Sequence, residues 1–272
     1  MDTIIKSNIE NDKMVDDFSC ELLDGKIRLA SVRGYISKPK HLQEDAVGSA
    51  VKDDRCFLNI VADGLGGYSK SDVASRIFVK EMLNWFADMD MDIIDDTDLI
   101  MKKITKKIRK INRKIKFRYR GKAQTTFALS LTNKYNTIIL NLGDSTIYTY
   151  ENDELKLLTY IKFYLTNKSY EQIRRHIFNF SVGSCIGEYP LFKIHKRLIE
   201  NEGQKLILSS DGVTDLISEE RFTNYFINDT DAKTIVNDAL TSPDVVRKSE
   251  DNISAIVVSL PKSSAKEKML KR

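Results

Sequence analysis

The sequence predicts an α+β fold, and three observations indicate it. Short apolar runs typical of strands come first, two long amphipathic helices follow, and further strands and shorter helices complete the chain. This order differs from the strict strand–helix alternation of a doubly wound parallel sheet. The 272 residues are within the reach of one large layered domain, and the low content of 4 prolines and 12 glycines argues against long linkers. We expect a polar lead-in over residues 1–19, a single domain over residues 20–262 and a basic tail over residues 263–272.

Nearly continuous apolar runs predict strands that are buried on both faces of a sheet. Such runs are Cys56–Ala62, Thr137–Leu142, Lys205–Ser209 and Ile253–Leu260, with further strands expected at Lys26–Val32 and Ala46–Val51. Thr125–Leu131 and Ser145–Tyr150 alternate apolar and polar residues and flank Thr137–Leu142 across turn-like gaps. We expect these three neighbours to form an antiparallel meander.

Helical spacing of apolar residues predicts two long helices. The first spans Ser69–Phe86, with Ser69 or Ser71 as its N-cap, and the second spans Thr97–Lys116. In the second helix isoleucines recur every three or four residues, while its other faces carry Lys and Arg. This pattern favours a solvated outer helix over a surface for nucleic acid or acidic membranes, which is the alternative. Shorter helices are expected at Glu219–Phe226 and Asp231–Leu240.

Overall composition is that of a globular protein, with 42% hydrophobic and 30% charged residues. The 43 Lys and Arg against 39 Asp and Glu give a net charge of +4, a weak argument for a nucleic-acid partner. Apolar runs stay below the roughly 18–20 residues of a membrane span, and the polar N-terminus has no apolar core of a signal peptide. The three cysteines are far apart and form no CxxC pair. We therefore expect a cytoplasmic protein with reduced thiols, without disulfides or a cysteine zinc site.

Carboxylates border five of the predicted strands. They are Glu44 with Asp45, then Asp63, Asp144, Asp211 and Asp251. Any one of them alone fits a turn, because Asp-Gly is a common turn signal. A carboxylate at the edge of a buried strand is costly, however, unless it is solvated, paired or bound to a cation. Five such positions in one domain predict that the strand ends converge on a cluster of carboxylates.

Carboxylates that lie close together cannot all stay ionised without a cation to neutralise them. Oxygen ligands without a contribution from His or Cys favour hard ions such as Mg²⁺ or Mn²⁺. Two such ions about 3.5–4 Å apart are a common device for activating water against a phosphate ester. The acids therefore predict a metal-dependent phosphate chemistry.

A series of short motifs now indicates a family. In chain order they are Glu44-Asp45, Val61-Ala-Asp-Gly-Leu-Gly-Gly67, Ala74-Ser75, Thr125-Thr126, Leu142-Gly-Asp-Ser145, Leu157-Leu-Thr159, Ser210-Asp-Gly-Val-Thr-Asp215 and Asp251-Asn252. The series resembles the metal-dependent, type 2C serine/threonine protein phosphatases, and its form is closer to the bacterial branch. The resemblance spans about residues 27–260. It implies a four-layer αββα sandwich, in which two mainly antiparallel sheets pack face to face with helix pairs outside.

The resemblance also implies two Mg²⁺ or Mn²⁺ ions and a set of ligands. Asp63 would bridge both ions, Asp211 and Asp251 would complete one site, and Glu44 with the carbonyl of Gly64 would support the other. A water between the two ions would attack phosphorus in line, so no phosphoenzyme is needed.

Two further positions, Asp144 and Asp215, match residues that hold a weaker third ion in some relatives. The family usually places an Arg four residues before the metal-binding Glu to hold the substrate phosphate. Here that position is Lys40, and Arg33 lies farther back across a small insertion. Lys lacks the bidentate fork of Arg, so either residue is a candidate for the phosphate contact.

The sequence departs from the family pattern elsewhere too. Leu65 stands where eukaryotic members have a His, and Gln124 stands where the family has a Gly before Thr125. The segment after Thr159 is atypical, and the flap that borders the substrate cleft is short, at about residues 160–182. These changes affect substrate choice most.

The hypothesis from the sequence is a cytoplasmic, Mg²⁺- or Mn²⁺-dependent phosphatase for phosphoserine and phosphothreonine in proteins. Its expected partners are phosphorylated substrates of an opposing Ser/Thr kinase, with no nucleic acid and no membrane, and the chain is expected to be a monomer. One alternative is a non-catalytic module that binds phosphoproteins, suggested by Lys40 and the altered flap. Another is a metal-dependent phosphodiesterase or nuclease that uses the basic helix.

Overall fold

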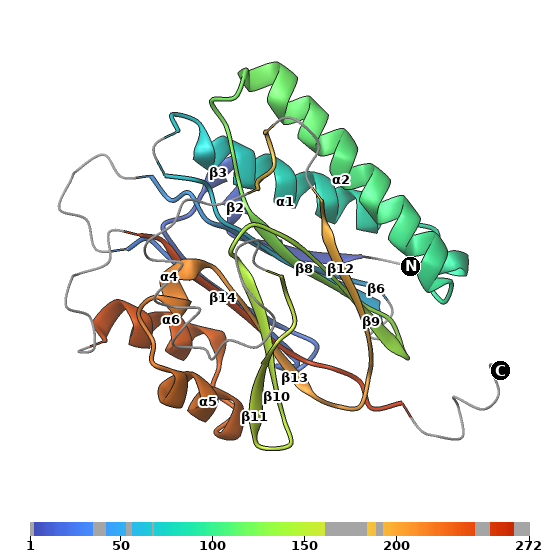
Figure 1. The fold of residues 1–272 in the computed structure, drawn as a ribbon, viewed down its shortest axis with the longest axis vertical. Helices are drawn as coiled ribbons and strands as arrows, with labels where there is room; N and C mark the ends of the chain where they lie inside the picture. Colours follow the sequence, from blue (N-terminus) through green and yellow to red (C-terminus); the bar gives the residue numbers. More distant parts are fainter. Residues whose placement is uncertain are drawn as a thin grey trace.

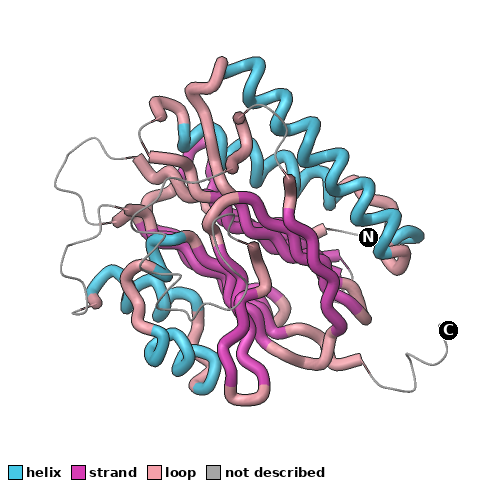
Figure 2. Tube along the Cα trace, viewed as in Figure 1, coloured by secondary structure: helices cyan, strands magenta, loops and turns pink. Residues whose placement is uncertain are grey.

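Two six-stranded antiparallel sheets pack face to face, and helices cover the outer face of each sheet (Figure 1, Figure 2). The computed structural model describes residues 3–34, 42–52, 56–66, 68–160, 184–188, 193–242 and 251–263. The predicted α+β class and the four-layer αββα sandwich are both confirmed.

The two sheets have strand orders β1-β6-β7-β8-β9-β12 and β11-β10-β13-β14-β5-β4, and a separate hairpin pairs β2 with β3. The first sheet contains β1 (Ile4–Ser7), β6 (Ala46–Lys52), β7 (Cys56–Ala62), β8 (Phe127–Thr132), β9 (Asn136–Leu142) and β12 (His195–Glu200). The second contains β4 (Asp17–Leu22), β5 (Ile27–Val32), β10 (Thr146–Glu151), β11 (Glu154–Leu157), β13 (Lys205–Ser209) and β14 (Ile253–Ser259), and the hairpin is β2 (Ile9–Glu10) with β3 (Lys13–Met14). Every strand predicted from the sequence is present, with ends that shift by at most two residues.

Each large sheet is covered by its own set of helices. The first sheet is covered by α1 (Ser71–Ala87) and α2 (Thr97–Tyr119), with the short helix η1 (Met91–Ile93) between them. The second sheet is covered by α4 (Asp211–Thr214), α5 (Glu219–Ile227) and α6 (Ala232–Thr241). The four predicted helices are confirmed, and the described residues add two short helices that were not predicted, η1 and α4.

Three apolar clusters hold the four layers together. One lies between α1, α2 and the first sheet, one lies between the two sheets, and one lies between the second sheet and α4 to α6. Strand β7 shows why its sequence is apolar throughout. Leu58 and Ile60 face the helices, whereas Phe57 and Val61 face the other sheet, and all four are at most 3% exposed. Successive side chains of a strand point to opposite faces, so a strand with both faces covered needs a continuous apolar run.

The predicted meander is wrong at its third strand. β8 and β9 pair as expected, but β10 belongs to the second sheet, where it pairs with β11 and β13. The chain crosses between the sheets at Gly143, whose φ of +96° suits glycine. An alternating pattern indicates which faces of a strand are buried, but it does not indicate which strand lies beside it.

Part of the chain expected to be a loose lead-in over residues 1–19 forms edge strands instead. β1 pairs with β6, and β4 pairs with β5, so the N-terminal region adds one strand to each sheet. Edge strands have one partner and a more open face, which explains why this region is polar. Ile4 and Ile5 are 49% and 39% exposed.

The predicted serine cap of the first helix is also wrong. Lys70 occupies the N-cap position of α1 without a side-chain cap. The Ser71 hydroxyl instead donates to the carbonyl of Leu65, in the loop that leaves β7. The serine therefore ties the loop to the helix rather than capping the helix end.

Helix α2 follows its sequence pattern closely. The Asp96 side chain caps its first turn by accepting from Leu99 N at 2.9 Å, and Arg120 ends it in the left-handed conformation. The isoleucine stripe is buried, at no more than 1% exposure for each member. Among the described residues, α2 is too polar to cross a membrane, and α1, α5 and α6 do not qualify either.

Replacing Ile108 by Ala should lower the free energy of unfolding by roughly 2–5 kcal/mol, because a fully buried side chain leaves a cavity between α2 and the first sheet. Chemical denaturation measures this loss. Lys106→Ala, at an exposed position of the same helix, is the control and should change stability by less than about 0.5 kcal/mol. Equal effects of the two substitutions would contradict the placement of the helix.

Candidate metal site

Antiparallel pairing places the acids of both sheets at one end of the sandwich. Asp45 precedes β6 and Asp63 follows β7. Because the register pairs Ala46 with Ala62, the two acids lie at the same end of the strand pair. In the second sheet Asp211 follows β13 and Asp251 precedes β14, which are likewise antiparallel partners. The start of one strand always lies beside the end of its antiparallel neighbour, which explains why these acids converge at one end of the sandwich.

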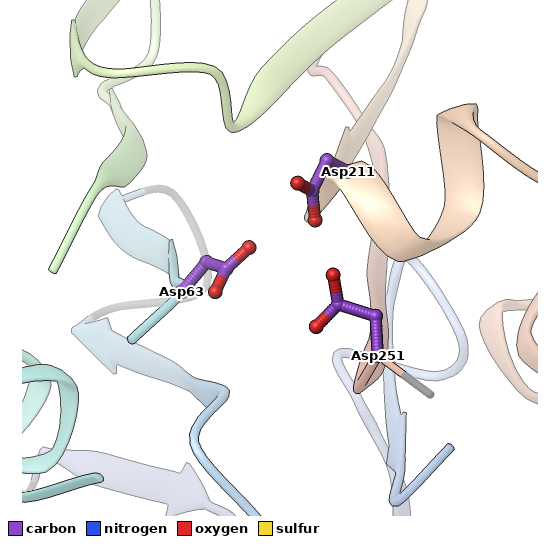
Figure 3. A group of neighbouring side chains, drawn as sticks. All are labelled: Asp63, Asp211 and Asp251. Atoms are coloured by element: carbon purple, nitrogen blue, oxygen red, sulfur yellow. The ribbon is translucent and has the colours of Figure 1, made fainter. Parts of the chain in front are cut away.

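Three of these carboxylates form a compact group. Asp63, Asp211 and Asp251 each place a carboxylate oxygen within 4.8 Å of the others (Figure 3). Asp63 comes from the first sheet, and Asp211 and Asp251 come from the second. Asp63 is 8% exposed, Asp211 is half-buried and Asp251 is open to solvent. The group is therefore accessible from one side.

Electrostatic repulsion within the group is strong. Burial, together with the charges of Asp211, Asp45 and Asp251, raises the pKa of Asp63 well above its ordinary value. Burial and the charge of Asp144 raise the pKa of Asp211 to about 7. None of the causes that shift these two pKa values is a Lys or Arg of the described residues, so this part of the cluster is short of positive charge.

Glu44 joins the cluster from the loop before β6. Burial, and then the charge of Asp251, raises the pKa of Glu44 to about 7. Its backbone is fixed from both sides, because its N–H donates to Asn252 Oδ1 at 2.7 Å and its carbonyl accepts from the Ser75 hydroxyl. This gives a structural role to the Ala74-Ser75 motif, which reaches the site from α1.

Asp45 was counted among the acids at strand ends but was not an expected metal ligand, and the structure places it within the cluster. It is fully buried, and its Oδ2 accepts from Ser210 Oγ at 2.8 Å, which joins the two sheets. Burial, and then the charge of Asp251, raises the pKa of Asp45 to about 7. Its pairing with Glu44 in front of an apolar strand was the available signal. Consecutive residues of an extended chain point to opposite sides, so the pair by itself does not indicate which carboxylate faces the site.

The backbone after β7 is held tightly. The carbonyl of Asp63 accepts from Thr125 Oγ1 at 2.6 Å and from Thr126 N at 2.8 Å. Gly64 lies where a Cβ atom would come within 2.9 Å of the backbones of Ser71 and Glu44. A glycine is therefore required at position 64 for the loop, α1 and the Glu44 segment to meet.

The remaining predicted site residues are Asp144, Asp215, Arg33 and Lys40. Asp144 is 7% exposed, and burial raises its pKa to about 6, with the charge of Asp251 contributing. Asp215 lies one turn after Asp211, at the C-cap of α4. Arg33 follows β5, where its guanidinium contacts Asp16 Oδ2 at 3.2 Å, and the adjacent Gly34 packs against the backbone of Asp251. Lys40 and most of the expected flap lie outside the described residues.

Gln124, which stands where the family has a Gly, contacts the segment that follows the expected flap. Gln124 Oε1 accepts from the Cys185 thiol at 3.1 Å, and Gly187 N donates to Asn112 Oδ1 of α2 at 2.6 Å. Ile186 also bridges to Thr125. The segment 184–188, which follows the expected flap in sequence, is thereby fixed between α2 and the loop that supports Asp63.

The donor set fits hard divalent cations. Among the described residues, Oδ1 of Asp45 and Oδ1 of Asp211 are buried oxygens that accept no hydrogen bond. Buried carboxylate oxygens without a donor are costly, and a cation would satisfy them. The cluster consists of oxygen donors, which is the chemistry that Mg²⁺ and Mn²⁺ prefer.

Fold and site together define a class of αββα sandwich proteins with an oxygen-donor cluster at one end of the paired sheets. The model of the protein phosphatase 2C family matches residues 37–233. The chain therefore belongs to the protein phosphatase 2C family.

Individual relatives are distant. The serine/threonine phosphatase stp of Listeria welshimeri is 29% identical over 125 residues, which are 44% of this chain and 49% of that protein. The matched region thus spans about half the length of this curated relative. Stp1 from Staphylococcus aureus has a similar structure, with a TM-score of 0.67 and 17% identity over 86% of this chain and 94% of that one. The catalytic domain of the phosphatase PstP, solved with two manganese ions, gives a TM-score of 0.63 and 19% identity over 87% of this chain and 98% of that one. At these identities the structural likeness shows the fold.

Mn²⁺ should raise the melting temperature of this protein, because a ligand that binds only the folded state stabilises it. At a hundred times the dissociation constant the gain is about 2.7 kcal/mol, or a shift of roughly 5–10 °C for a chain of this size. Asp211→Asn should abolish most of the shift in a thermal melt, since the amide removes a charged ligand. Asp153→Asn, in an exposed turn, should keep it. An unchanged shift in Asp211→Asn would show that the ion binds elsewhere.

A second prediction concerns Gly64. Gly64→Ala forces a Cβ against the backbones of Ser71 and Glu44, so it should destabilise the protein by about 1–3 kcal/mol and weaken Mn²⁺ binding. Gly66→Ala is the matched control two residues away, where the new Cβ meets open space. Calorimetric titration with Mn²⁺ and denaturation of both variants test this. Indistinguishable variants would contradict the close approach at Gly64.

Proposed function

We propose that the chain is a protein phosphatase that hydrolyses phosphoserine and phosphothreonine with the help of two Mg²⁺ or Mn²⁺ ions. The observation that carries this proposal is the group of Asp63, Asp211 and Asp251, in which three carboxylates from two sheets share a space of 4.8 Å. Family membership and the serine/threonine phosphatases among the relatives support the same substrate class. The proposed catalytic unit is one domain over residues 20–262, acting as a cytoplasmic monomer against a Ser/Thr kinase.

The residues of the site would have different roles in binding the ions. Asp63, Asp211 and Asp251 would hold one ion, and Glu44 with the Gly64 carbonyl would share Asp63 to hold the second. Asp144 and Asp215 would serve a weaker third position. When bound, the ions would supply Lewis-acid activation of the attacking water and neutralise charge that develops on the phosphate.

Asp45 would take the proton of the attacking water. One of its carboxylate oxygens accepts from Ser210, and the other, Oδ1, is buried beside Asp63 without a donor. A buried carboxylate oxygen that accepts no hydrogen bond is a candidate acceptor for this proton. The bond from Ser210 fixes the orientation of the carboxylate, so Asp45 is held ready for this role.

The substrate phosphate needs a cation from the protein, and the candidates are Arg33 and Lys40. Arg33 lies at the correct end of the second sheet, but its guanidinium contacts Asp16. Exchange of that exposed contact for a phosphate is inexpensive, because surface ion pairs contribute about 0–1 kcal/mol. A bidentate Arg–phosphate contact is stronger than a Lys contact, so we favour Arg33.

Hydrolysis of phosphoserine and phosphothreonine peptides should require Mn²⁺ or Mg²⁺ and stop in EDTA. Asp63→Asn should lower kcat at least about a thousandfold, since loss of the ions forfeits several kcal/mol of transition-state stabilisation. Phosphate release from a panel of phospho-Ser, phospho-Thr and phospho-Tyr peptides measures this, with Asp153→Asn as the active control.

Two outcomes would contradict the proposal. Robust hydrolysis in EDTA would exclude the metal-dependent mechanism. Binding of phosphopeptide without turnover at millimolar Mn²⁺ would instead support a non-catalytic phosphoprotein-binding module, the alternative that the Lys at position 40 favours. Faster release from a diester substrate than from any phosphopeptide would indicate a phosphodiesterase.

A further inference from the structure

Helix α2 presents a basic surface to solvent. Between Asp98 and Asp144 the sequence contains no acidic residue. The exposed cations of α2 and the turn after it are Lys102, Lys103, Lys106, Arg109, Lys110, Arg113, Lys114, Arg118, Arg120 and Lys122. The helix lies on the outer side of the first sheet, beside α1 (Figure 1). The name basic ridge is used for the row Lys106, Lys110 and Arg113 together with the exposed Arg120 and Lys122 at the C-terminal end of the helix.

Charge on one flank of the helix is partly neutralised within the protein. Glu81 of α1 bonds to Lys107 at 2.6 Å and also to Lys114, and these two contacts lower the pKa of Glu81 to about 2. Lys106, Lys110 and Arg113 are exposed and form an adjacent row, because residues three or four apart share a helix face. The ridge therefore keeps an excess of positive charge toward solvent.

The two ends of the helix differ in charge. Before α2 and in its first turn lie exposed acids, at Asp90, Asp92, Asp95, Asp96 and Asp98. The opposite end carries Arg118, Arg120 and Lys122. Positive potential therefore rises along α2 toward its C-terminus.

The basic end of α2 leads directly to the candidate site. Lys122 O accepts from Lys70 N at 3.0 Å, Gln124 O accepts from Leu65 N at 3.1 Å, and Thr126 N donates to Asp63 O at 2.8 Å. Residues 122–126 thus run beside residues 63–70, and their backbone spans at most about 14 Å. An extended peptide that crosses this distance needs about four residues.

Among acidic partners, a short acidic polypeptide fits these features best. A lipid surface would need apolar groups to insert, but the isoleucines of α2 are buried, and Phe117, 75% exposed, is the exception on this face. A long nucleic acid that followed the helix would meet the acids at its N-terminal end. A short acidic segment can lie on the basic ridge alone while a neighbouring phosphorylated residue reaches Asp63.

We propose that the basic ridge of α2 is a docking surface for acidic segments of the phosphoprotein substrates, so that the preferred substrates carry a run of Asp, Glu or further phosphorylated residues that begins about four residues from the phosphorylated Ser or Thr. This inference rests on the proposed phosphatase function. Oppositely charged surfaces accelerate encounter and select partners, and the effect falls as salt screens the charges.

The test compares two phosphothreonine peptides with the same central sequence. One continues into an acidic run from the fourth residue on either side, and the other continues into Ser and Gln. With Mn²⁺ and the full chain, the ratio of kcat/KM between the acidic and the neutral peptide should be tenfold or more at low salt and should approach one at high salt. Charge reversal by Lys110→Glu with Arg113→Glu should lower the low-salt ratio to about one.

The matched control reverses two exposed lysines on the other side of the sandwich, Lys26→Glu with Lys233→Glu, which changes the net charge by the same amount. This control should keep the ratio, and equal melting temperatures would show that both double variants are folded.

A wild-type ratio near one, or a ratio that survives charge reversal on α2, would overturn the inference while leaving phosphatase activity in place. Sedimentation with phosphatidylcholine–phosphatidylserine vesicles that depends on Lys110 and Arg113, without peptide preference, would assign the surface to membranes and also overturn it. Absence of turnover on both peptides would instead reject the proposed function itself.

Discussion

Mutual repulsion among buried carboxylates is the constraint on which the site depends. Asp45, Asp63 and Asp211 come from two different sheets, and each has a pKa raised by burial and by neighbouring carboxylates. Such a group would push the sheets apart unless something else held them. Two cross-sheet hydrogen bonds do so, from Ser210 to Asp45 and from the Glu44 backbone to Asn252, together with the apolar cluster between the sheets. The rigid sandwich therefore keeps the carboxylates close together despite their repulsion. Binding of a divalent cation would reduce this electrostatic repulsion.

Support for the site extends outward through both helices of the first layer. Ser75 of α1 holds the Glu44 carbonyl, and the chain that leaves α2 holds the Asp63 carbonyl through Thr125 and Thr126. The same segment fixes residues 184–188 through Gln124, and α2 fixes them through Asn112. A single helix thus connects the carboxylate cluster, the segment after the expected flap and a basic outer surface. The docking surface that we propose and the carboxylate cluster are therefore supported by the same helix.

Local sequence patterns predicted the elements well and their neighbours poorly. Continuous apolar runs such as Cys56–Ala62 identified doubly covered strands, and the isoleucine stripe identified the buried face of α2. The pairing of β10 was missed, because an alternating pattern records which faces are buried and not which strand is adjacent. The N-terminal edge strands were missed for a related reason, since an edge strand needs few apolar residues and resembles a loop in composition.

For the site, the acids next to strand ends were visible in the sequence, and their number predicted that the strand ends converge. The sequence alone thus determined the residue types, the spacing and the oxygen-only chemistry. Only the tertiary structure decided which carboxylates meet, because that depends on how two separate sheets pack. It joined Asp45 to Ser210 across the sheets, brought Asp63 to Asp211 and Asp251, and placed Arg33 beside Asp16. Contacts between residues far apart in the chain follow from the packing of whole layers, and no local pattern encodes them.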